Sequence, residues 1–301
     1  METIELSGKG RTMRTEQEML DLILTFARND DNIRAVVMNG SRANPNAPRD
    51  IFQDFDIACL VNDVKPYTRN KSIPSLFGEI LILQEPEDMQ DPPPDNDGTY
   101  GYLMQFMDGN RIDLSFHPPD IFKTVVADSQ TIVLLDKDGT LVNVPPSSDK
   151  DYFPKPPTEK QFRDCCNEFW WVSPYVAKAL WRGELTNAKH IQDVYVRDQL
   201  MKMLVWYFGV RTGFKKAPGK QGKYIRPDVE PEIWNELERT YADADFERIW
   251  ASLFVMGSLF RRLAHAVAAH VGLEYHQHED DNVSRFLRTI KQLPKDAAEI
   301  G

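Results

Sequence analysis

The chain has 301 residues, which is enough for two ordinary domains, and hydrophobic residues make up 42% of it. Its formal net charge of -10 and its sequence pI of about 5.2 offer no basic footprint for a phosphate backbone, so we expect no nucleic acid partner. The same charge suits a small polycationic ligand, and it equally suits simple solubility.

Nothing in the sequence points to a membrane or to an oxidising compartment. No apolar run reaches the roughly 18 residues of a spanning helix, and the first residues lack the apolar core of a secretory signal. Of the three cysteines, Cys165 and Cys166 are adjacent, which fits neither a disulfide framework nor a metal site, so we expect all three to pack in a core. We therefore predict a cytoplasmic protein, and we favour a monomer.

The N-terminal half has the pattern of a mixed α/β domain. Thr15 and Glu18 make a capping box before an apolar stripe, which predicts a helix over residues 15–28. Short apolar runs predict strands at residues 35–38, 57–61, 78–83, 100–107 and 111–116. Asp-Gly-Asn at 108–110 is typical of a hairpin turn. A second hairpin is predicted from strands at 131–135 and 140–144 around the turn at 136–139.

The pattern becomes helical after a proline-rich stretch, PPSSDKDYFPKPP, which we interpret as a linker. The predicted division is residues 1–145, a linker at 146–157, and residues 158–301. Helices are expected after Thr158, over about 186–210 before Gly213, and after Asp245 as far as Gly272. The regular apolar stripe of the last helix indicates the core of a helical bundle.

The chemistry-bearing pattern is a strand that runs into Gly40-Ser41, followed by a strand that carries Asp54-Phe55-Asp56. Gly40 lets the backbone turn closely and present N–H groups to phosphate oxygens, and Ser41 adds a hydroxyl donor. Side chains two apart in a strand share a face, so Asp54 and Asp56 point the same way. Two carboxylates on one face suit Mg²⁺, which takes hard oxygen ligands and shares the rest with phosphates.

A third carboxylate fits the same set. Asp113 alternates with Ile112 and Leu114 in a later strand and so faces away from their core side. It can complete a metal site or accept a proton from an attacking hydroxyl. Each motif is common alone, whereas the whole set at this spacing indicates phosphoryl transfer with Mg²⁺ as the cofactor.

These residues also carry a resemblance to a known family. The stretch MNGSRANPNAPRDIFQDFDI resembles the active-site segment of the nucleotidyltransferase superfamily and, more narrowly, of the aminoglycoside 6-adenylyltransferases that modify streptomycin. DGNRIDLSF, LLDKDG, FWWVSPYVAKALWRGEL and VRDQLMKMLVWY are similar to that family as well. The resemblance covers about residues 13–293, and residues 1–12, which match nothing, are expected to be an extension.

The resemblance implies an N-terminal nucleotidyltransferase (polymerase-beta-like) mixed sheet with flanking helices and a C-terminal helical domain that closes the cleft. It implies ATP- and Mg²⁺-dependent transfer of AMP to a hydroxyl on the streptidine ring of streptomycin, with release of pyrophosphate. By the same resemblance, Gly40, Ser41 and Arg42 would hold the ATP phosphates. Asp54 and Asp56 would bind Mg²⁺, and Asp113 would serve as a ligand or as the base.

Two weaker patterns are candidate contacts for a cationic acceptor. Asp95 and Asp97 lie in a proline-rich loop, which is either simply solvated or an acidic wall that binds guanidinium groups. Trp170 and Trp171 are expected to pack in the first helix of the bundle. Adjacent residues cannot share a helix face, so one of the two is a candidate to line the cleft and stack on a cation or an adenine.

Two further patterns are interpreted as structural. Asp136-Lys137-Asp138-Gly139-Thr140 resembles the nucleophile motif of haloacid dehalogenase-type phosphatases, but the acidic pair which that chemistry needs on a later buried strand is missing, so we predict a turn. The polar run at 276–281 is interpreted as a flexible segment rather than a metal site. The rival functions are transfer to another small molecule or a protein, a non-catalytic nucleotide-binding protein, and a phosphatase.

Overall fold

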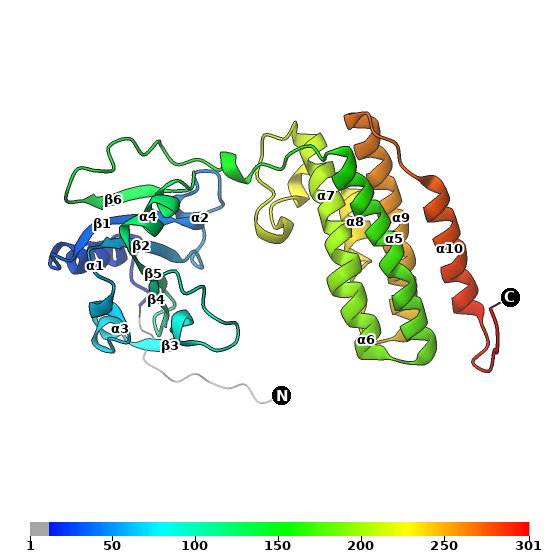
Figure 1. Ribbon diagram of the computed structural model, residues 1–301, viewed down its shortest axis with the longest axis horizontal. Helices are drawn as coiled ribbons and strands as arrows, with labels where there is room; N and C mark the ends of the chain where they lie inside the picture. Colours follow the sequence, from blue (N-terminus) through cyan, green and yellow to red (C-terminus); the bar gives the residue numbers. More distant parts are fainter. Residues whose placement is uncertain (1–11, 301) are drawn as a thin grey trace. The chain divides into compact units, whose positions relative to one another are not determined.

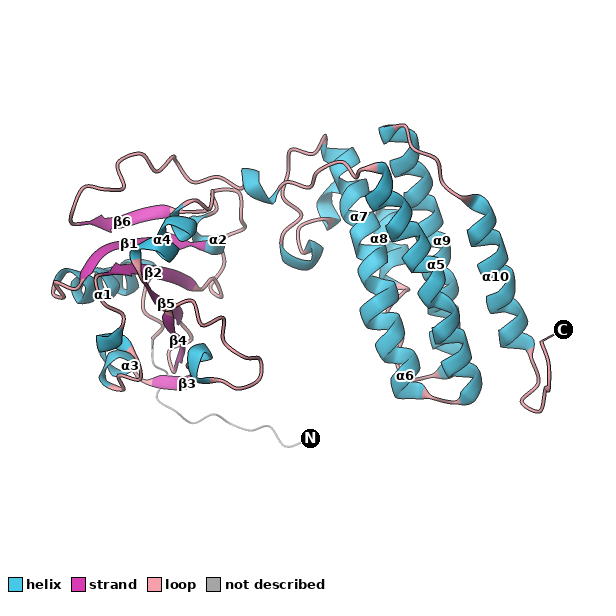
Figure 2. Ribbon diagram, in the orientation of Figure 1, coloured by secondary structure: helices cyan, strands magenta, loops and turns pink. Residues whose placement is uncertain are grey.

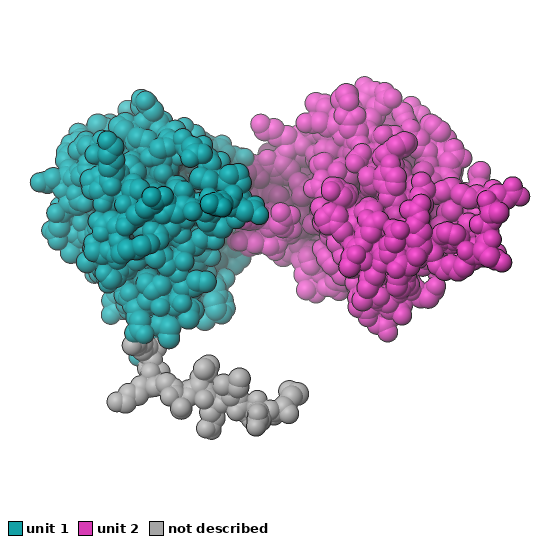
Figure 3. Space-filling model, turned by 60° about the horizontal axis from the view of Figure 1, so that its bottom comes forward, with its two compact units in different colours: residues 1–151 teal, residues 152–301 magenta. Residues whose placement is uncertain are grey.

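The computed structural model describes residues 12–300 and divides into two compact units, residues 1–151 and 152–301 (Figure 3). Apart from Thr12, the predicted extension over residues 1–12 lies outside the described residues. No helix in the described range is long and apolar enough to cross a membrane.

The first unit is a sheet with helices on both faces (Figures 1 and 2). Its elements in chain order are α1 (Glu16–Arg28), β1 (Ile33–Asn39), α2 (Gly40–Ala43), β2 (Phe55–Val61), α3 (Ser72–Leu76), β3 (Ile80–Gln84), β4 (Tyr100–Phe106), β5 (Arg111–His117), α4 (Pro119–Val126) and β6 (Ile132–Asp136). The predicted capping box of α1 is present, because Thr15 and Glu18 bond each other's backbone N–H groups. The strands predicted before residue 136 are all present.

The described strands form one six-stranded sheet in the order β3-β4-β5-β2-β1-β6. Strands β2 and β5 pair in parallel, and the other neighbours are antiparallel, so the sheet is mixed as predicted. The larger core lies between the sheet and α1 with α3, where Met19, Ile23 and Phe77 are buried. Helix α4 covers part of the other face through Phe122. That face stays partly open next to β2 and β5.

The predicted second hairpin is wrong. Residues 140–144 form no strand, and β6 instead pairs antiparallel with β1 at the edge of the sheet. The carboxylate of Asp136 accepts a hydrogen bond from the backbone N–H of Leu141 at 2.7 Å, and this turn directs the chain away from the sheet directly after β6. The motif at residues 136–140 therefore forms a turn at the end of β6, as predicted.

The second unit is all-helical. It contains α5 (Glu159–Arg182), α6 (Leu185–His190), a π-helical stretch (Ile191–Val196), α7 (Arg197–Thr212), α8 (Pro231–Glu238), α9 (Phe246–Val271) and α10 (Gln277–Gln292). Gly213 and Gly272 end α7 and α9 with φ of 62° and 73°, the left-handed geometry that favours glycine. The bundle core includes Phe169 stacked on Phe260 at 3.9 Å. The predicted bundle is confirmed.

The three cysteines are free and buried, as expected from their pattern. Burial raises the pKa of the Cys165 thiol to about 12, so the thiol stays protonated and is a poor nucleophile. The cysteines therefore contribute packing rather than chemistry.

The flexible segment predicted at 276–281 is wrong. His276 is the N-cap of α10, residues 277–281 form its first turn, and Asp280 is fully buried. Its carboxylate pairs with both guanidinium ends of Arg261 and accepts hydrogen bonds from the hydroxyls of Tyr275 and Ser284, each at 2.9 Å. A buried charge is stable only when it is paired and hydrogen-bonded, and this network fixes α10 to α9.

Candidate active site

The parallel pairing of β2 with β5 places Asp56 directly opposite Asp113. Phe55 and Ile57 are buried on the core side of β2, as Ile112 is on β5. Because side chains alternate along a strand, the two aspartates share the opposite, partly open face. Two carboxylates far apart in the chain therefore meet on one face of the sheet.

Asp54 stands immediately before β2 and lies within reach of a cation that the sequence analysis missed. Nε of Arg111 is 3.7 Å from Oδ2 of Asp54. Nε and Nη2 of the same guanidinium each lie 2.7 Å from an oxygen of Asp113. Arg111 stands two residues before Asp113 in β5, so strand periodicity was the signal that would have found it.

The electrostatics of this cluster are those of crowded carboxylates. Burial raises the pKa of Asp56 to about 6, and repulsion from Asp113 and Asp54 adds to the effect. The charges of Arg111 and Arg42 act in the opposite direction. At neutral pH the face therefore carries negative charge that one guanidinium only partly offsets.

Gly40 brings the backbone after β1 against this cluster. Its φ of +70° lies in the left-handed region, and a Cβ atom added there would lie 2.0 Å from Oδ2 of Asp56. The next residue, Ser41, is held to the following loop, because its carbonyl oxygen accepts a hydrogen bond from Nε2 of Gln53 at 3.2 Å. The glycine turn and Asp56 are thus in direct contact, which only glycine permits.

Arg42, predicted to hold phosphates, is buried beside the cluster. Its guanidinium lies over the ring of Phe55 at 3.9 Å, pairs with Glu16 at 3.0 Å and donates to the carbonyl oxygen of Gln53 at 2.8 Å. Its Nε is buried with no hydrogen-bond partner among the described residues. The observed contacts clamp the loop between Ser41 and Asp54, and a phosphate contact by Arg42 stays a prediction.

The donor set suits a magnesium ion, although the side chains are not arranged around one. Asp54, Asp56 and Asp113 offer only hard carboxylate oxygens, which Mg²⁺ prefers. In the described part of the chain, however, no group of three His, Cys, Asp or Glu side chains is arranged to hold a metal. The reason is visible in the contacts: both oxygens of Asp113 face the guanidinium of Arg111.

The loop that carries Asp95 and Asp97 is exposed and tied to the carboxylate face. Asp97 accepts the backbone N–H of Thr99 at 2.9 Å, and Oγ1 of Thr99 lies 3.2 Å from Nδ1 of His117. His117 is in β5, four residues after Asp113, which corresponds to about 13 Å along the same strand. The acidic loop is thus anchored to the strand that bears the third carboxylate.

His117 is buried and its hydrogen bonds define its protonation. The Ser115 hydroxyl donates to the carbonyl oxygen of Ile57 at 3.1 Å, so Ser115 accepts from Nε2–H of His117 at 2.8 Å. Nδ1 then accepts the proton of the Thr99 hydroxyl. Burial lowers the pKa of His117 and so keeps the ring neutral, whereas the negative charge of Asp97 acts in the opposite direction.

The two predicted tryptophans take different positions. Trp170 is buried in the bundle core, and its Nε1–H donates to the hydroxyl of Tyr275 at 2.9 Å. Trp171 is 63% exposed and lies edge-on to Tyr175. Trp170 therefore packs, while Trp171 is free to stack on a ligand.

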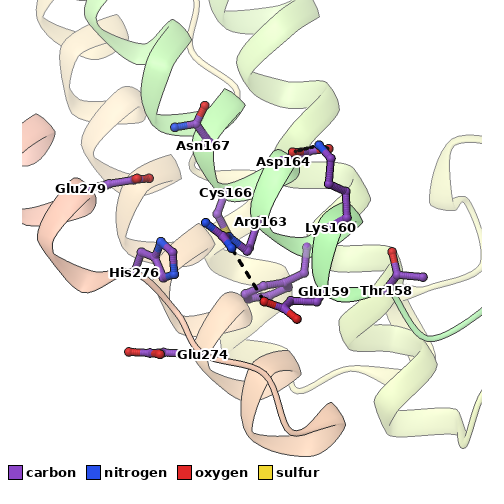
Figure 4. Close-up of a pocket in the computed structure, with 11 residues that line it drawn as sticks. Thr158, Glu159, Lys160, Arg163, Asp164, Cys166, Asn167, Glu274, His276 and Glu279 are labelled. Atoms are coloured by element: carbon purple, nitrogen blue, oxygen red, sulfur yellow. Dashed lines mark hydrogen bonds and ion pairs between the residues drawn. The ribbon is translucent and has the colours of Figure 1, made fainter.

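A cavity of about 680 Å³ opens in the second unit beside the start of α5 (Figure 4). Its lining is charged but largely self-paired: Arg163 lies 3.8 Å from Glu159, and Lys160 lies 2.6 Å from Asp164. His276 faces it from the segment before α10. None of the predicted site residues lines this cavity, and the three aspartates all belong to the first unit.

Comparison with known proteins gives a consistent result. The sequence profile of the streptomycin adenylyltransferase family matches residues 13–290. The aminoglycoside 6-adenylyltransferase of Bacillus subtilis is 37% identical over 281 residues, which cover 92% of this chain and 98% of that protein. The enzyme of the same name from Campylobacter jejuni is 39% identical, over 94% of this chain and 97% of its own. A solved structure of an aminoglycoside 6-adenyltransferase from Bacillus subtilis is 34% identical, with a TM-score of 0.47 over 93% of this chain and all of that one.

Proposed function

The chain belongs to the streptomycin adenylyltransferase family, and from that premise we propose that it transfers AMP from ATP to a hydroxyl group on the streptidine ring of streptomycin. The products are adenylylated, inactive streptomycin and pyrophosphate. The family membership supports the reaction class, and the names of the relatives support an aminoglycoside acceptor.

The observation that carries the proposal is the carboxylate face of the sheet. Asp56 and Asp113 lie opposite each other on β2 and β5, Asp54 precedes β2, and Gly40 packs against Asp56. Burial, together with repulsion from Asp113 and Asp54, raises the pKa of Asp56, and a divalent cation bound among the three carboxylates would relieve that repulsion. A bound Mg²⁺ would neutralise charge that develops on the phosphates.

In the proposed reaction, a substrate hydroxyl oxygen attacks the α-phosphorus of ATP. One O–P bond forms, the bond from the α-phosphorus to the bridging oxygen breaks, and pyrophosphate leaves. Asp54 and Asp56 would hold the metal, and Asp113 would either be a third ligand, with the hydroxyl proton passing to solvent, or accept that proton itself. The Gly40-Ser41 turn presents donors to the triphosphate. Positioning and charge neutralisation supply most of the rate enhancement in such transfers.

Recognition of a cationic acceptor is supported by charge. Asp95 and Asp97 are exposed in a loop anchored to β5, the strand that carries Asp113, and carboxylates bind guanidinium groups through paired hydrogen bonds. The exposed ring of Trp171 is a candidate stacking surface. We place the reaction in the cytoplasm because it consumes ATP, and we keep the monomer as the working state.

The test is pyrophosphate release with ATP and Mg²⁺ in the presence of streptomycin, spectinomycin or kanamycin. Release only with streptomycin supports the proposal in full. Release only with another acceptor keeps the chemistry and changes the substrate. No release with any acceptor, in a folded protein that still binds ATP, would instead favour a non-catalytic nucleotide-binding protein.

A further inference from the structure

Arg111 is the cation that occupies the carboxylate face. Its guanidinium makes a two-pronged pair with Asp113, at 2.7 Å for each contact, and lies 3.7 Å from Asp54. The side chain comes from the same strand as Asp113, two residues earlier, so the backbone fixes both on one face.

This arrangement competes with metal binding. Mg²⁺ requires near-octahedral geometry with carboxylate oxygens pointing at the ion. Both oxygens of Asp113 now point at Arg111, and no three-ligand group is preformed in residues 12–300. A free divalent cation would have to displace the guanidinium and then sit beside its positive charge, which is unfavourable at such short range.

A nucleoside triphosphate makes the exchange of Arg111 for a metal ion on the carboxylates favourable. Mg²⁺ bound to a triphosphate arrives with net negative charge, and phosphate oxygens are good partners for the planar guanidinium fork. Arg111 is 39% exposed and held only by side-chain contacts, so it is free to turn from Asp113 to a phosphate. The metal would then take the carboxylate oxygens that Arg111 leaves.

We propose that Arg111 stands in for the metal ion in the nucleotide-free protein and yields the carboxylates only when a metal-bound nucleoside triphosphate arrives, whose phosphates its guanidinium then binds. Arg111 thereby couples metal binding to nucleotide binding and keeps free divalent ions out of the site. The inference rests on the proposed function, because it takes Asp54, Asp56 and Asp113 as the metal site.

The experiment is a titration with Mn²⁺, followed by the electron paramagnetic resonance signal of the free ion, without acceptor. It is run with and without an ATP analogue that has a methylene bridge between its α- and β-phosphates. Because the triphosphate itself binds Mn²⁺, binding to the protein is taken as the loss of free-ion signal beyond that of Mn²⁺ and the analogue without protein. We expect weak Mn²⁺ binding to the wild-type protein alone and tight binding with the analogue. Arg111→Gln should bind Mn²⁺ about tenfold more tightly without the analogue and should bind the analogue about tenfold more weakly. Arg34→Gln, which removes an arginine paired with Asp138 outside the site, should match the wild type.

The outcomes distinguish the role of Arg111 from the metal site on which the proposed function depends. Unchanged or weaker Mn²⁺ binding by a folded Arg111→Gln protein overturns the role of Arg111, even if the enzyme adenylylates its acceptor. Absence of Mn²⁺ binding by the wild type with the analogue overturns the metal site and the proposed function together. If Arg111→Gln does not fold, the Nε–H nuclear magnetic resonance signal of Arg111, assigned with Arg111→Lys, decides. It should shift with Mg²⁺ and the analogue but not with Mg²⁺ alone, and a shift with Mg²⁺ alone contradicts the inference.

Discussion

The backbone of Gly40 lies directly against the carboxylate of Asp56, so closely that a Cβ atom on Gly40 would come within 2.0 Å of Oδ2. The glycine directly follows β1 as the first residue of α2, and the aspartate is the second residue of β2. Their contact explains why the backbone next to the carboxylate face needs a glycine at this position.

Gly40→Ala should therefore displace Asp56 and reduce AMP transfer by about a hundredfold, since an error of about 1 Å in a reacting group costs that much. The positive φ alone should also lower the free energy of unfolding by about 1–2 kcal/mol. Gly139→Ala is the matched control, because Gly139 has φ of +65° and nothing within 4 Å of a Cβ atom. Gly139→Ala should show the same loss in the free energy of unfolding but keep full AMP transfer activity. Equal rates of AMP transfer by the two variants would contradict the role given to the contact between Gly40 and Asp56.

Asp56→Asn should make the metal-free protein more stable while it abolishes transfer. Burial and two neighbouring carboxylates raise the pKa of Asp56 from 3.8 to about 6, so its charge opposes folding at pH 7.5. After discounting for solvent screening, the neutral side chain should add about 1–2 kcal/mol. Thermal unfolding in a chelating buffer measures this. Asp120→Asn, at an exposed surface pair with Lys123, should have no effect. A lower midpoint for Asp56→Asn would contradict the charge crowding.

The first unit should lose stability as the pH falls below about 6.5 because of His117. Burial lowers the pKa of His117 in the fold, so the unfolded chain takes up a proton first. The stabilisation by the neutral ring is complete above 6.5 and disappears as the pH falls through the lowered value. The measurement is the thermal unfolding midpoint between pH 8 and 5. His117→Gln should reduce the fall of the midpoint below pH 6.5, while His278→Gln, at an exposed position, should leave it unchanged. Parallel curves for the wild type and His117→Gln would be the contrary result.

Asp280→Asn should destabilise the second unit by about 2–3 kcal/mol, because Arg261 and Tyr275 would lose their shared buried partner. Its exposed neighbour supplies the control, and Asp281→Asn should change the unfolding free energy by less than about 0.5 kcal/mol. Chemical denaturation followed by tryptophan fluorescence reports the difference. Equal stability in the two variants would mean that the network does not hold α10.

Much of the fold follows from local sequence patterns. The capping boxes, the glycine helix ends and the alternating strands depend on neighbours in the chain, so they were predictable. The pairing of β6 with β1 depends on a contact between distant segments, which explains why the hairpin at 131–144 was mispredicted. Asp280 is in helical register with the buried Leu287 and Ile290, so it lies on the core face of α10, whereas its pairing with Arg261 depends on tertiary packing.

In the candidate site, too, some features follow from local sequence patterns and others depend on contacts between distant residues. Strand periodicity placed Asp56 and Asp113 on exposed faces, but their alignment follows from the parallel register of β2 and β5. The pairing of Arg111 with Asp113 and Asp54 depends on side-chain rotamers across two strands. Likewise, the burial of Arg42 over Phe55 follows from tertiary packing, which no spacing rule encodes.

The most direct test of the central claim is mass spectrometry of streptomycin after incubation with the protein, ATP and Mg²⁺. The wild type should add one AMP unit to the antibiotic, and Asp54→Asn, with an unchanged unfolding midpoint, should add none. Unmodified streptomycin with the active wild-type protein, or full modification by Asp54→Asn, would contradict the account.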